Sequence, residues 1–449
     1  MHKIKQLYSN LRSSFWFAPS VIVAYSIALA VILVETDSAV SDQWLAQWPR
    51  LFGAGPAGAR DMLSTIAGSM MTIMGVTFSM TLVALTLASS QYTSRILRNF
   101  MRSHVTQYTL GVFAGIFSYC LIVLRTIRGS GEVEFVPGLA VFFAFVLALG
   151  SVGVLIVFIH HIASSIQASS IIASVAKESI AVIDRLFPEK IGQGPDENED
   201  KDQVLLSLEK KTWRTVPAKV SGYIQSVNSD ALLRLARDRK TILRMEHGIG
   251  DYIVEETGLA SLALEDPLDQ ETIAALNSYY NISSYRTVEQ DPAFGVRQIV
   301  DIALKALSPG INDTSTAVMC IDYLAAILAR LASRQLPSSH RYEEGELRVI
   351  TIVQTFKSLL DDSFDQIRRS AEGNVAVMER MLGAIENIAS LTTNPYRRRA
   401  LCEQIQRIDE LADRTIESAH DRARIEKRLM HVRERFESEP VLYPRKEKE

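Results

Sequence analysis

The densest group of polar side chains in the charged part of the chain lies between positions 286 and 313. Its members are residue types that bind ligands or form ion pairs: Arg286, Gln290, Asp291, Arg297, Asp301, Lys305, Asn312 and Asp313. Asp301 and Lys305 are four positions apart, which allows a salt bridge on one helix face, and Arg297 lies one turn earlier. Asn312 or Asp313 is suited to cap a following helix. Two interpretations stay open: a small polar pocket or subunit contact around the first arginine and aspartate of the group, or helix caps and salt bridges without a ligand.

Paired histidines and a set of arginines follow two of the apolar runs. Imidazole titrates near neutral pH and binds metals, but the adjacent His160 and His161 would point about 100° apart on a helix, which suits one shared ion poorly. Interfacial histidines at the end of an apolar run are the simpler interpretation. Arg95, Arg98 and Arg102 recur at helical spacing. Contact with lipid headgroups explains them, although a ring of them between subunits would favour anions.

Catalytic motifs are missing from the sequence. It contains no GxSxG, Walker A, GxGxxG, HExxH or kinase-like set, and no paired carboxylates in an apolar setting. Cys120, Cys320 and Cys402 are far apart and predict neither a zinc site nor a disulfide framework. The net charge of −3 gives no sign of a nucleic-acid partner. We therefore expect no enzyme activity, no cofactor and no metal.

The stretch most able to position functional groups is the uncharged segment 62–94. It is longer than the roughly 20 apolar residues that cross a bilayer as a helix. Small and hydroxyl residues recur in it at steps of three, four or seven and so share one helix face: Ser64, Gly68, Thr72, Gly75, Ser79, Thr86 and Ser90. This small-residue stripe either lets another helix pack closely or, repeated around an axis, lines a conduction path. Both interpretations stay open.

Three further apolar runs, at 19–34, 105–124 and 135–159, predict membrane-spanning helices. The first predicts an uncleaved span, because it is long for a signal peptide and no A-x-A site follows it. None of the four expected spans contains Asp, Glu or Lys. Gly111 and Gly115 in the third run have the GxxxG spacing that favours close helix packing. Basic residues before the first run and after the second give a modest positive-inside bias, which places both termini in the cytoplasm.

The rest of the chain has the charge density of an aqueous domain. The fourth run continues without a breaker to Pro188, which predicts one long helix projecting into the cytoplasm. We expect six parts: a four-span transmembrane domain at 1–160, a helical extension of span four at 161–188, a flexible acidic linker at 189–211, a small α+β module at 212–265, a cytoplasmic helical domain at 266–436 and a disordered tail at 437–449. The expected fold class is a membrane all-α part with four transmembrane helices, followed by a cytoplasmic α+β, mostly helical domain.

Several phrases of the sequence together resemble a bacterial family of predicted membrane proteins of unknown function (domain of unknown function 2254). They are SFWFAPS at the first span, GVTFSMTLVALTLASSQYTSRILRNF at the second, GVFAGIFSYCLIVLRT at the third, FIHHIASSIQ after the fourth, and RTVEQDPAFGVRQIVDIALKALSPGINDTSTA in the charged part. The resemblance covers about 15–329. Ser94 and Thr314 depart from it, since the family is expected to have proline there. It implies a multi-pass architecture in the bacterial inner membrane and brings no established activity.

Two functions are compatible with these observations. One is a homo-oligomeric, channel- or transport-like assembly with a cytoplasmic regulatory domain. Four spans without an internal repeat are few for a secondary transporter, so a path between subunits is favoured over one within a subunit. The alternative is a membrane-anchored sensor or scaffold whose cytoplasmic domain binds a ligand or partner. The expected partners are the lipid bilayer and further copies of the chain.

Overall fold

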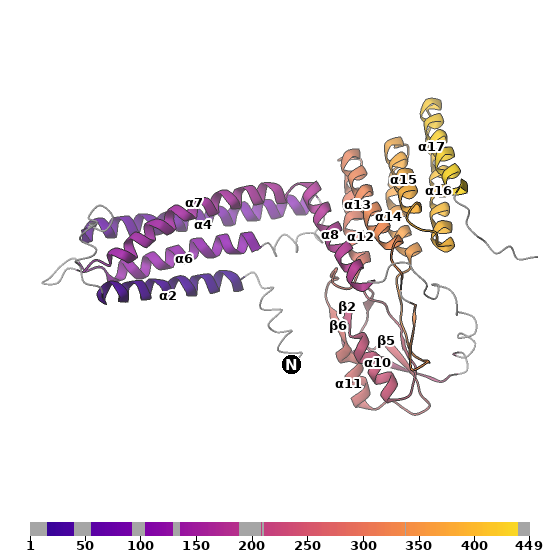
Figure 1. Ribbon diagram of the computed structural model, residues 1–449, viewed down its shortest axis with the longest axis horizontal. Helices are drawn as coiled ribbons and strands as arrows, with labels where there is room; N and C mark the ends of the chain where they lie inside the picture. The colour runs from indigo at the N-terminus through magenta and orange to yellow at the C-terminus, as the bar shows by residue number, and fades with distance from the viewer. Residues whose placement is uncertain are drawn as a thin grey trace, which may run out of the picture. The chain divides into compact units, whose positions relative to one another are not determined.

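The computed structural model describes residues 16–39, 55–91, 104–128, 135–187, 208, 211–336 and 338–438. The chain divides into two compact units, Met1–Ile171 and Ile172–Glu449, whose elements are labelled in Figure 1. The arginines at positions 95, 98 and 102, residues 189–207 of the expected linker and residues 439–449 of the expected tail lie outside the described residues.

The first unit is built from four long helices: α2 (Phe17–Ala39), α4 (Pro56–Gln91), α6 (His104–Thr126) and α7 (Gly138–Ser165). The helix α6 contacts the other three and is the most buried of them, so it forms the centre of the bundle. Close packing of α2 on α6 depends on two glycines. A Cβ added at Gly111 would lie 2.7 Å from Ile22 Cδ1, and one at Gly115 would lie 2.5 Å from Ser26 Oγ. The GxxxG spacing therefore serves packing inside one protomer.

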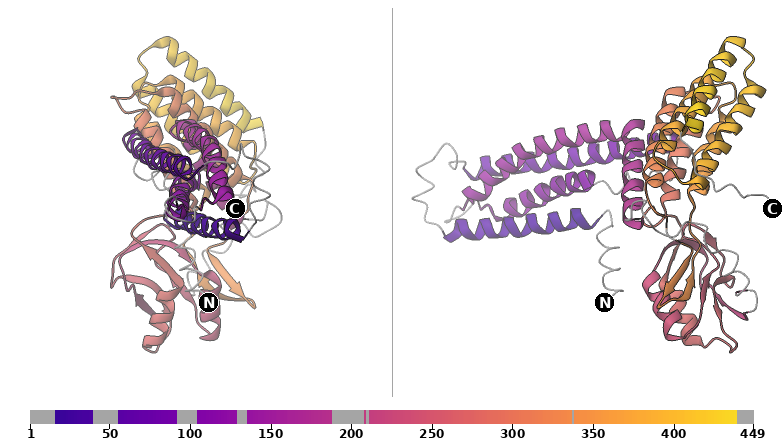
Figure 2. Two further views of the ribbon diagram at one scale, coloured as in Figure 1. Left: turned by 90° about the vertical axis from the view of Figure 1, so that its left-hand side faces the viewer. Right: turned by 45° about the vertical axis from the view of Figure 1, so that its right-hand side comes forward.

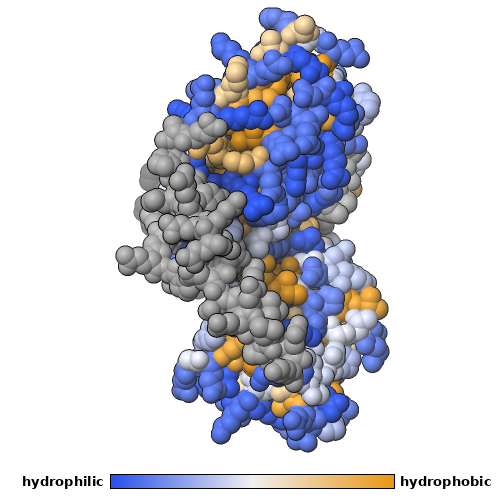
Figure 3. Space-filling model, turned by 90° about the vertical axis from the view of Figure 1, so that its right-hand side faces the viewer, coloured by the Kyte–Doolittle hydropathy of each residue, from blue (hydrophilic) through white to orange (hydrophobic). Residues whose placement is uncertain are grey.

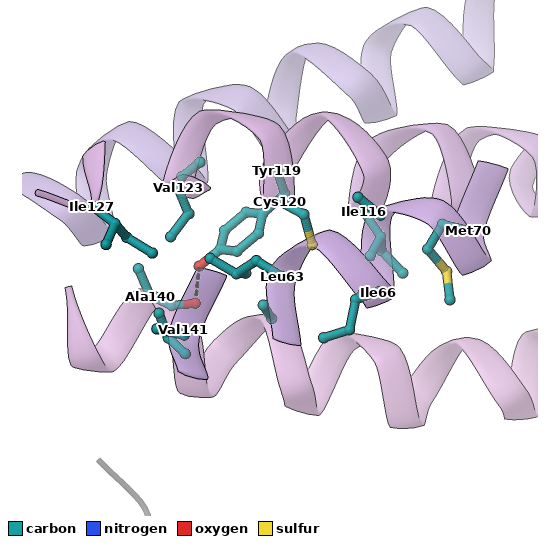
Figure 4. Packing of buried hydrophobic residues seen from close by; sticks show 14 of the residues in the cluster. Leu63, Ile66, Met70, Ile116, Tyr119, Cys120, Val123, Ile127, Ala140 and Val141 are labelled. Atoms are coloured by element: carbon teal, nitrogen blue, oxygen red, sulfur yellow. Dashed lines mark hydrogen bonds between the residues drawn. The ribbon is translucent and has the colours of Figure 1, made fainter. Parts of the chain in front are cut away.

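Apolar side chains fill the interior of this bundle. Leu63, Ile66 and Met70 of α4 point toward α6, where Tyr119 lies among them (Figure 4). The hydroxyl group of Tyr119 donates a hydrogen bond to the carbonyl oxygen of Ala140 at 2.8 Å, which satisfies its polar group in the apolar interior. The described interior is thus a packed apolar core of the kind that excludes water.

The carboxylate of Asp37 joins the end of α2 to the start of α7. Its oxygens accept hydrogen bonds from the backbone N–H groups of Leu139, at 3.3 Å, and Ala140, at 3.1 Å. These N–H groups lack partners within a first helical turn, and Pro137 at the N-cap supplies no side-chain bond. The helix α2 therefore extends past the expected end at Val34. The expectation that the spans contain no acidic residue is wrong, because a candidate span reaches Asp37.

A break separates α7 from α8 (Ala168–Leu186), so the expectation of one continuous helix is also wrong. The hydroxyl group of Ser165 donates to the carbonyl of His161 at 2.6 Å, and the backbone N–H of Gln167 bonds to Ser164 at 3.3 Å instead of one residue further back. Serine hydroxyls that bond to the backbone bend helices, and a three-residue step tightens the last turn. These local bonds end the helix without proline or glycine.

The second unit contains two sheets. Their strands are β1 (Trp213–Pro217), β2 (Gly222–Val227), β3 (Leu243–Met245), β4 (Tyr252–Ile253), β5 (Gly258–Ala263), β6 (Tyr280–Ser283), β7 (His340–Glu343) and β8 (Glu346–Ile350). One sheet has the order β1-β5-β3-β8-β7 and the other β4-β2-β6. All described pairs of these strands are antiparallel except β3–β8, in which Leu243 lies opposite Val349. Strands β6, β7 and β8 lie in the range expected to be helical.

Eight helices complete the described part of this unit after α8: α10 (Ser229–Asp238), α11 (Gln270–Tyr279), α12 (Pro292–Ala306), α13 (Thr314–Ala332), α14 (Phe356–Ser370), α15 (Val375–Ala389), α16 (Pro395–Thr415) and α17 (Ala419–Ser438). All but α17 begin at an Asn, Asp or Thr whose side chain accepts a bond from the first turn. In both views of Figure 2, α12–α17 gather apart from the strands. Helix α12 packs on α13 and α14, while α13 also packs on α15.

The helix α8 is fixed to α12 and α13 of the second unit. A Cβ added at Gly295 of α12 would lie 1.9 Å from Ser179 Oγ, so the two helices cross with no room for a side chain. The carboxylate of Asp184 accepts hydrogen bonds at 2.8 Å from Arg330 and from Arg334. Glycine packing and charge pairing together hold this helix in place.

Five described helical segments are long and apolar enough to cross a membrane. Four belong to the first unit: Phe17–Asp37, Pro56–Leu87, His104–Thr126 and Gly138–Ser165. The fifth is α13. The chain therefore has several candidate membrane helices and a mixed, mostly helical α/β part.

Candidate functional site

The small-residue stripe lies on the outside of the first unit. Ser64, Gly68 and Thr72 are exposed, as are Gly75, Ser79 and Thr86, while the side chain of Ser90 lies outside the described residues. The opposite face of α4 carries Leu63, Ile66 and Met70 into the core. A Cβ added at Gly68 or Gly75 would meet no described atom within 4 Å beyond the helix's own backbone. The stripe is therefore an unoccupied face of the described protomer.

The threonine hydroxyls of the stripe bond to their own helix. Thr72 donates to the carbonyl of Gly68 at 3.0 Å, and Thr86 donates to that of Leu82 at 2.9 Å. A hydroxyl group that already donates within the helix loses less when it faces an apolar neighbour. The stripe can accordingly meet lipid, another helix or water at modest cost.

The polar group at 286–313 separates into two places. Arg286, Gln290 and Asp291 lie at the start of α12, whereas Asn312 and Asp313 follow its far end. Fifteen helical residues span about 22 Å at 1.5 Å per residue, so one small ligand cannot contact both ends. A small ligand bound at Arg286 and Asp291 would therefore not reach Asn312 and Asp313.

The centre of the first place is the buried carboxylate of Asp291. Its side chain is 1% exposed, and one oxygen accepts hydrogen bonds from Nε of Arg286 at 2.8 Å and from its Nη2 at 2.7 Å. The other oxygen caps α12 by accepting from the backbone N–H of Phe294 at 3.1 Å, with Gln354 Nε2 at 3.4 Å. Burial raises the pKa of the Asp291 carboxyl, and the charge and hydrogen bonds of Arg286 oppose the rise.

Three segments distant in sequence converge on this ion pair. Gly250 has a φ of +93°, and a Cβ there would lie 2.4 Å from Asp291 Oδ2 and 2.8 Å from Arg286 Nη2. Only a glycine tolerates both the left-handed conformation and this close approach. Gln290 fastens the same segment to β2, since its Oε1 accepts a hydrogen bond from the backbone N–H of Val227 at 3.1 Å. The ion pair and Gln290 thus join the turn at Gly250 and strand β2 to the start of α12.

The exposed part of this site is an arginine. The side chain of Arg286 is 27% exposed, and its guanidinium carbon lies 5.4 Å from the centre of the Phe294 ring. Asp362 of α14 lies within electrostatic range of Arg286 and of Arg297. Chemically, the arrangement can hold one guanidinium group in a fixed orientation toward an anionic ligand or partner.

The remaining expected residues have local partners. Arg297 pairs with Asp301 at 2.8 Å, and Lys305 is exposed near the end of α12. Asp313 caps α13: its carboxylate accepts from the hydroxyl of Thr316 at 2.6 Å and from the backbone N–H of Thr316 at 3.0 Å, and these bonds lower the pKa of the Asp313 carboxyl. Asn312 has a φ of +49° in the turn before it. These contacts shape the connection between two helices.

The paired histidines do not converge. His160 is exposed, while His161 is half-buried with its Nε2 3.4 Å from Ser165 Oγ. Within the described parts of the chain, no three His, Cys, Asp or Glu side chains are placed to hold a metal ion.

Three residues outside the expected set make long-range contacts in the fold. Asp37, Gly250 and Gln354 each touch a segment far away in the sequence. For Asp37, an acidic residue just after an apolar run indicates a polar contact at the end of the helix. The sequence carries no comparable local signal for the other two.

The apolar helices of the first unit, beside a mixed and mostly helical second unit, define a multi-pass membrane protein. The family described as predicted membrane protein (DUF2254) matches residues 12–387, and the chain belongs to this family. Uncharacterized proteins of Mycobacterium bovis and Mycobacterium tuberculosis are similar to it, with 30% identity over 443 residues that cover 95% of this chain and 81% of each relative. No solved structure matches the chain.

Proposed function

We propose that the chain forms a homo-oligomeric, channel-like assembly in the bacterial inner membrane, with a path between protomers along the small-residue stripe of α4. The observation that carries this proposal is the position of the stripe. Its described members all face outward, while the apolar side of α4 packs into the bundle. A helix face with exposed glycines and threonine hydroxyls that bond within the helix suits close approach by the same face of another copy.

The packed interior supports a path between protomers over one within a protomer. Leu63, Met70 and Phe113 fill the described centre of the bundle and are 5% exposed or less. A polar solute would have to displace these side chains to pass through. The stripe offers hydroxyl groups and open space on the outside, and repetition around an axis would bring several stripes together.

In this proposal four helices span the membrane and α13 does not. The carboxylate of Asp322, in the middle of α13, pairs with Arg380 of α15, and Arg330 pairs with Asp184 of α8. A spanning helix would bring such charges into hydrocarbon, where they are costly. The face of the molecule in Figure 3 is mostly hydrophilic, with apolar side chains in separate patches, which suits an aqueous second unit. Both termini are cytoplasmic in this arrangement.

The second unit acts as the regulator because α8 connects it to the last span. Only residues 166 and 167 separate α7 from α8, and α8 is locked to α12 and α13 by Gly295 and Asp184. A ligand or partner that moves the second unit therefore has a short covalent route to the membrane helices.

The test compares two substitutions on α4 in the full-length protein. Gly75→Leu puts a large side chain on the stripe and is expected to lower both the assembled fraction, measured by mass in detergent, and ion flux into liposomes. Met80→Phe is the matched control, because Met80 is exposed and lies about 100° around the helix from Ser79. Normal assembly and normal flux after Gly75→Leu would overturn the proposal.

Substitutions that remove only hydroxyl groups separate a wet face from a packed one. Thr72→Val and Ser79→Ala are expected to change flux and leave assembly intact if the stripe lines the path. If these variants assemble less well and the wild-type protein itself shows no flux, the stripe is a packing surface alone.

A second candidate function is a membrane-anchored sensor whose second unit binds an anionic ligand. It is favoured by the partly exposed Arg286, which the buried carboxylate of Asp291 holds in one orientation. Inorganic phosphate and small dicarboxylates serve as probes in a thermal-shift measurement on the full chain. Stabilisation of the wild type but not of Arg286→Gln would support this function, and no stabilisation by any probe would count against it.

A further inference from the structure

A groove between α4 and α7 has an apolar lining with a charge at one end. It measures about 470 Å³ and is lined by Asp61, Met62, Thr65, Ile66, Phe145, Ala148 and Leu149. This volume is within the range of small-molecule sites, roughly 300–1,000 Å³. Ile66 contributes to the groove from the border of the core shown in Figure 4. The groove opens on the surface of the first unit, where lipid surrounds a membrane helix.

The polar end of the groove is the exposed carboxylate of Asp61. Among the residues that the structure describes, no arginine, lysine or histidine lies within 4 Å of the carboxylate of Asp61. The neighbouring Arg60 instead donates to the carbonyl of Ile127 at 2.9 Å. The hydroxyl of Thr65 donates to the backbone carbonyl of Asp61 at 2.7 Å, so it does not satisfy the side chain. The carboxylate therefore suits a cationic hydrogen-bond donor.

The groove lies near the starts of α4 and α7, at the depth of a lipid headgroup and the first part of its acyl chain. Asp61 lies five residues after the start of α4, and Leu149 lies eleven residues after the start of α7. At 1.5 Å per residue the lining covers roughly 8 Å along α4, from Asp61 to Ile66. A span is about 30 Å long, so the groove holds the first part of an acyl chain and places the headgroup at the end of the helices. Beyond it, Gly153 of α7 leaves open space for the rest of the chain.

We infer that this groove binds a phospholipid whose headgroup carries a primary ammonium group, with one acyl chain along Ile66 and Leu149 and the ammonium donating to Asp61. The acyl chain gives no selectivity, because every membrane lipid offers the same methylene groups. Selectivity comes from the headgroup. A primary ammonium has three N–H donors, whereas a trimethylated ammonium of the same charge has none.

The test measures lipid retention by native mass spectrometry of the full-length protein in mild detergent. The lipids are palmitoyl-oleoyl phosphatidylethanolamine, phosphatidylcholine and phosphatidylglycerol in equal amounts. An exposed ion pair supports a preference of about two- to five-fold for ethanolamine over choline. Asp61→Asn is expected to abolish this preference. Leu149→Trp, which fills the groove, is expected to lower retention of all three lipids.

A matched control keeps the test specific to the groove. Val157 is exposed on the same helix, two turns beyond the groove, and Val157→Trp is expected to leave retention unchanged. Equal retention of ethanolamine and choline lipids by the wild type would overturn the inference. So would a preference that persists in Asp61→Asn. If Leu149→Trp disrupts assembly but not lipid retention, a second copy of the chain covers the groove and the inference is wrong.

Discussion

Replacing Asp291 by alanine is expected to loosen the start of α12 far more than the loss of an ordinary helix cap would. The substitution removes the acceptor for the backbone N–H of Phe294 and leaves the guanidinium of Arg286 without its carboxylate. Asp313→Ala is the matched control, because Asp313 caps the next helix in the same way and is hydrogen-bonded to Thr316 rather than to an arginine. The difference between the two variants isolates the charge pair.

The expected magnitude follows from these contacts. A lost aspartate cap costs about 1 kcal/mol. Removing one partner of a buried ion pair costs roughly 3–5 kcal/mol, and the partial exposure of Arg286 reduces this to about 2 kcal/mol. Asp291→Ala should therefore cost about 3 kcal/mol, and Asp313→Ala about 1 kcal/mol. At 1.4 kcal/mol per factor of ten, these values correspond to about 150-fold and about 5-fold changes in the opening equilibrium.

Hydrogen exchange of the full-length protein in detergent measures these equilibria locally. Amides of residues 292–306 should exchange about 150-fold faster in Asp291→Ala, and those of α13 about 5-fold faster in Asp313→Ala. Equal effects of the two variants would refute the reasoning, because they would mean that the Arg286 pair adds nothing beyond a cap.

Three further perturbations test other contacts. Burial raises the folded-state pKa of Asp291, so the free energy of unfolding falls as pH rises from the unfolded-state pKa to that raised pKa, while the ionised carboxylate keeps its pair with Arg286. Urea unfolding should show the free energy of unfolding of wild type, relative to Asp291→Asn, falling as pH rises above about 4. Asp37→Ala removes two hydrogen bonds to a charged group at the start of α7 and should cost about 2 kcal/mol in thermal melts in detergent. Gly295→Ala collides with Ser179 and should cost about 1–3 kcal/mol by hydrogen exchange in α8.

Controls and contradicting results differ among these three tests. If the stability of the wild type relative to Asp291→Asn rises with pH, the effect of Arg286 on the pKa of Asp291 is larger than the effect of burial. Thr36→Ala, on the exposed side of α2, should cost less than about 0.5 kcal/mol, and an equal loss would remove the special role of Asp37. Ser179→Gly should relieve part of the Gly295→Ala defect, and a purely additive double variant would contradict direct contact.

The apolar runs predicted the helices of the first unit because few other structures are possible for them. An uncharged segment long enough to cross a bilayer must satisfy its backbone groups internally, which leaves the helix. The GxxxG spacing at Gly111 and Gly115 likewise predicted close packing. The helix ends were less accurate, since Asp37 is polar yet belongs to α2, held there by bonds to α7 that no local pattern contains.

The sequence predicts which small residues share one face of α4, but it does not predict whether that face lies inside or outside the bundle. Helical periodicity tells which residues share a face, whereas the neighbour of that face depends on tertiary packing. Inside the protomer, α4 turns its larger apolar side chains inward and leaves Gly68 and Gly75 outside. The polar residues at 286–313 are near one another in sequence, but the fifteen-residue helix α12 places the first of them far from the last in space.

The β7–β8 hairpin was missed although it has a local signal. Glu344 and Gly345 have φ values of +55° and +78°, the conformation of a two-residue hairpin turn, and glycine at the second turn position is typical of it. The parallel pairing of β8 with β3 has no such signal. Its partner strands are far apart in sequence, and only the folded chain brings them together.

The same pairing has a consequence for the order in which the chain folds during synthesis. Strand β3 pairs with β5 on one side soon after both leave the ribosome, but its other edge waits for β8. About 100 residues separate β3 from β8, which at ~5–20 residues per second means roughly 5–20 s. During this interval the edge of β3 is an open template for other strands. Until β8 is synthesised, the growing second unit therefore exposes an unpaired strand edge.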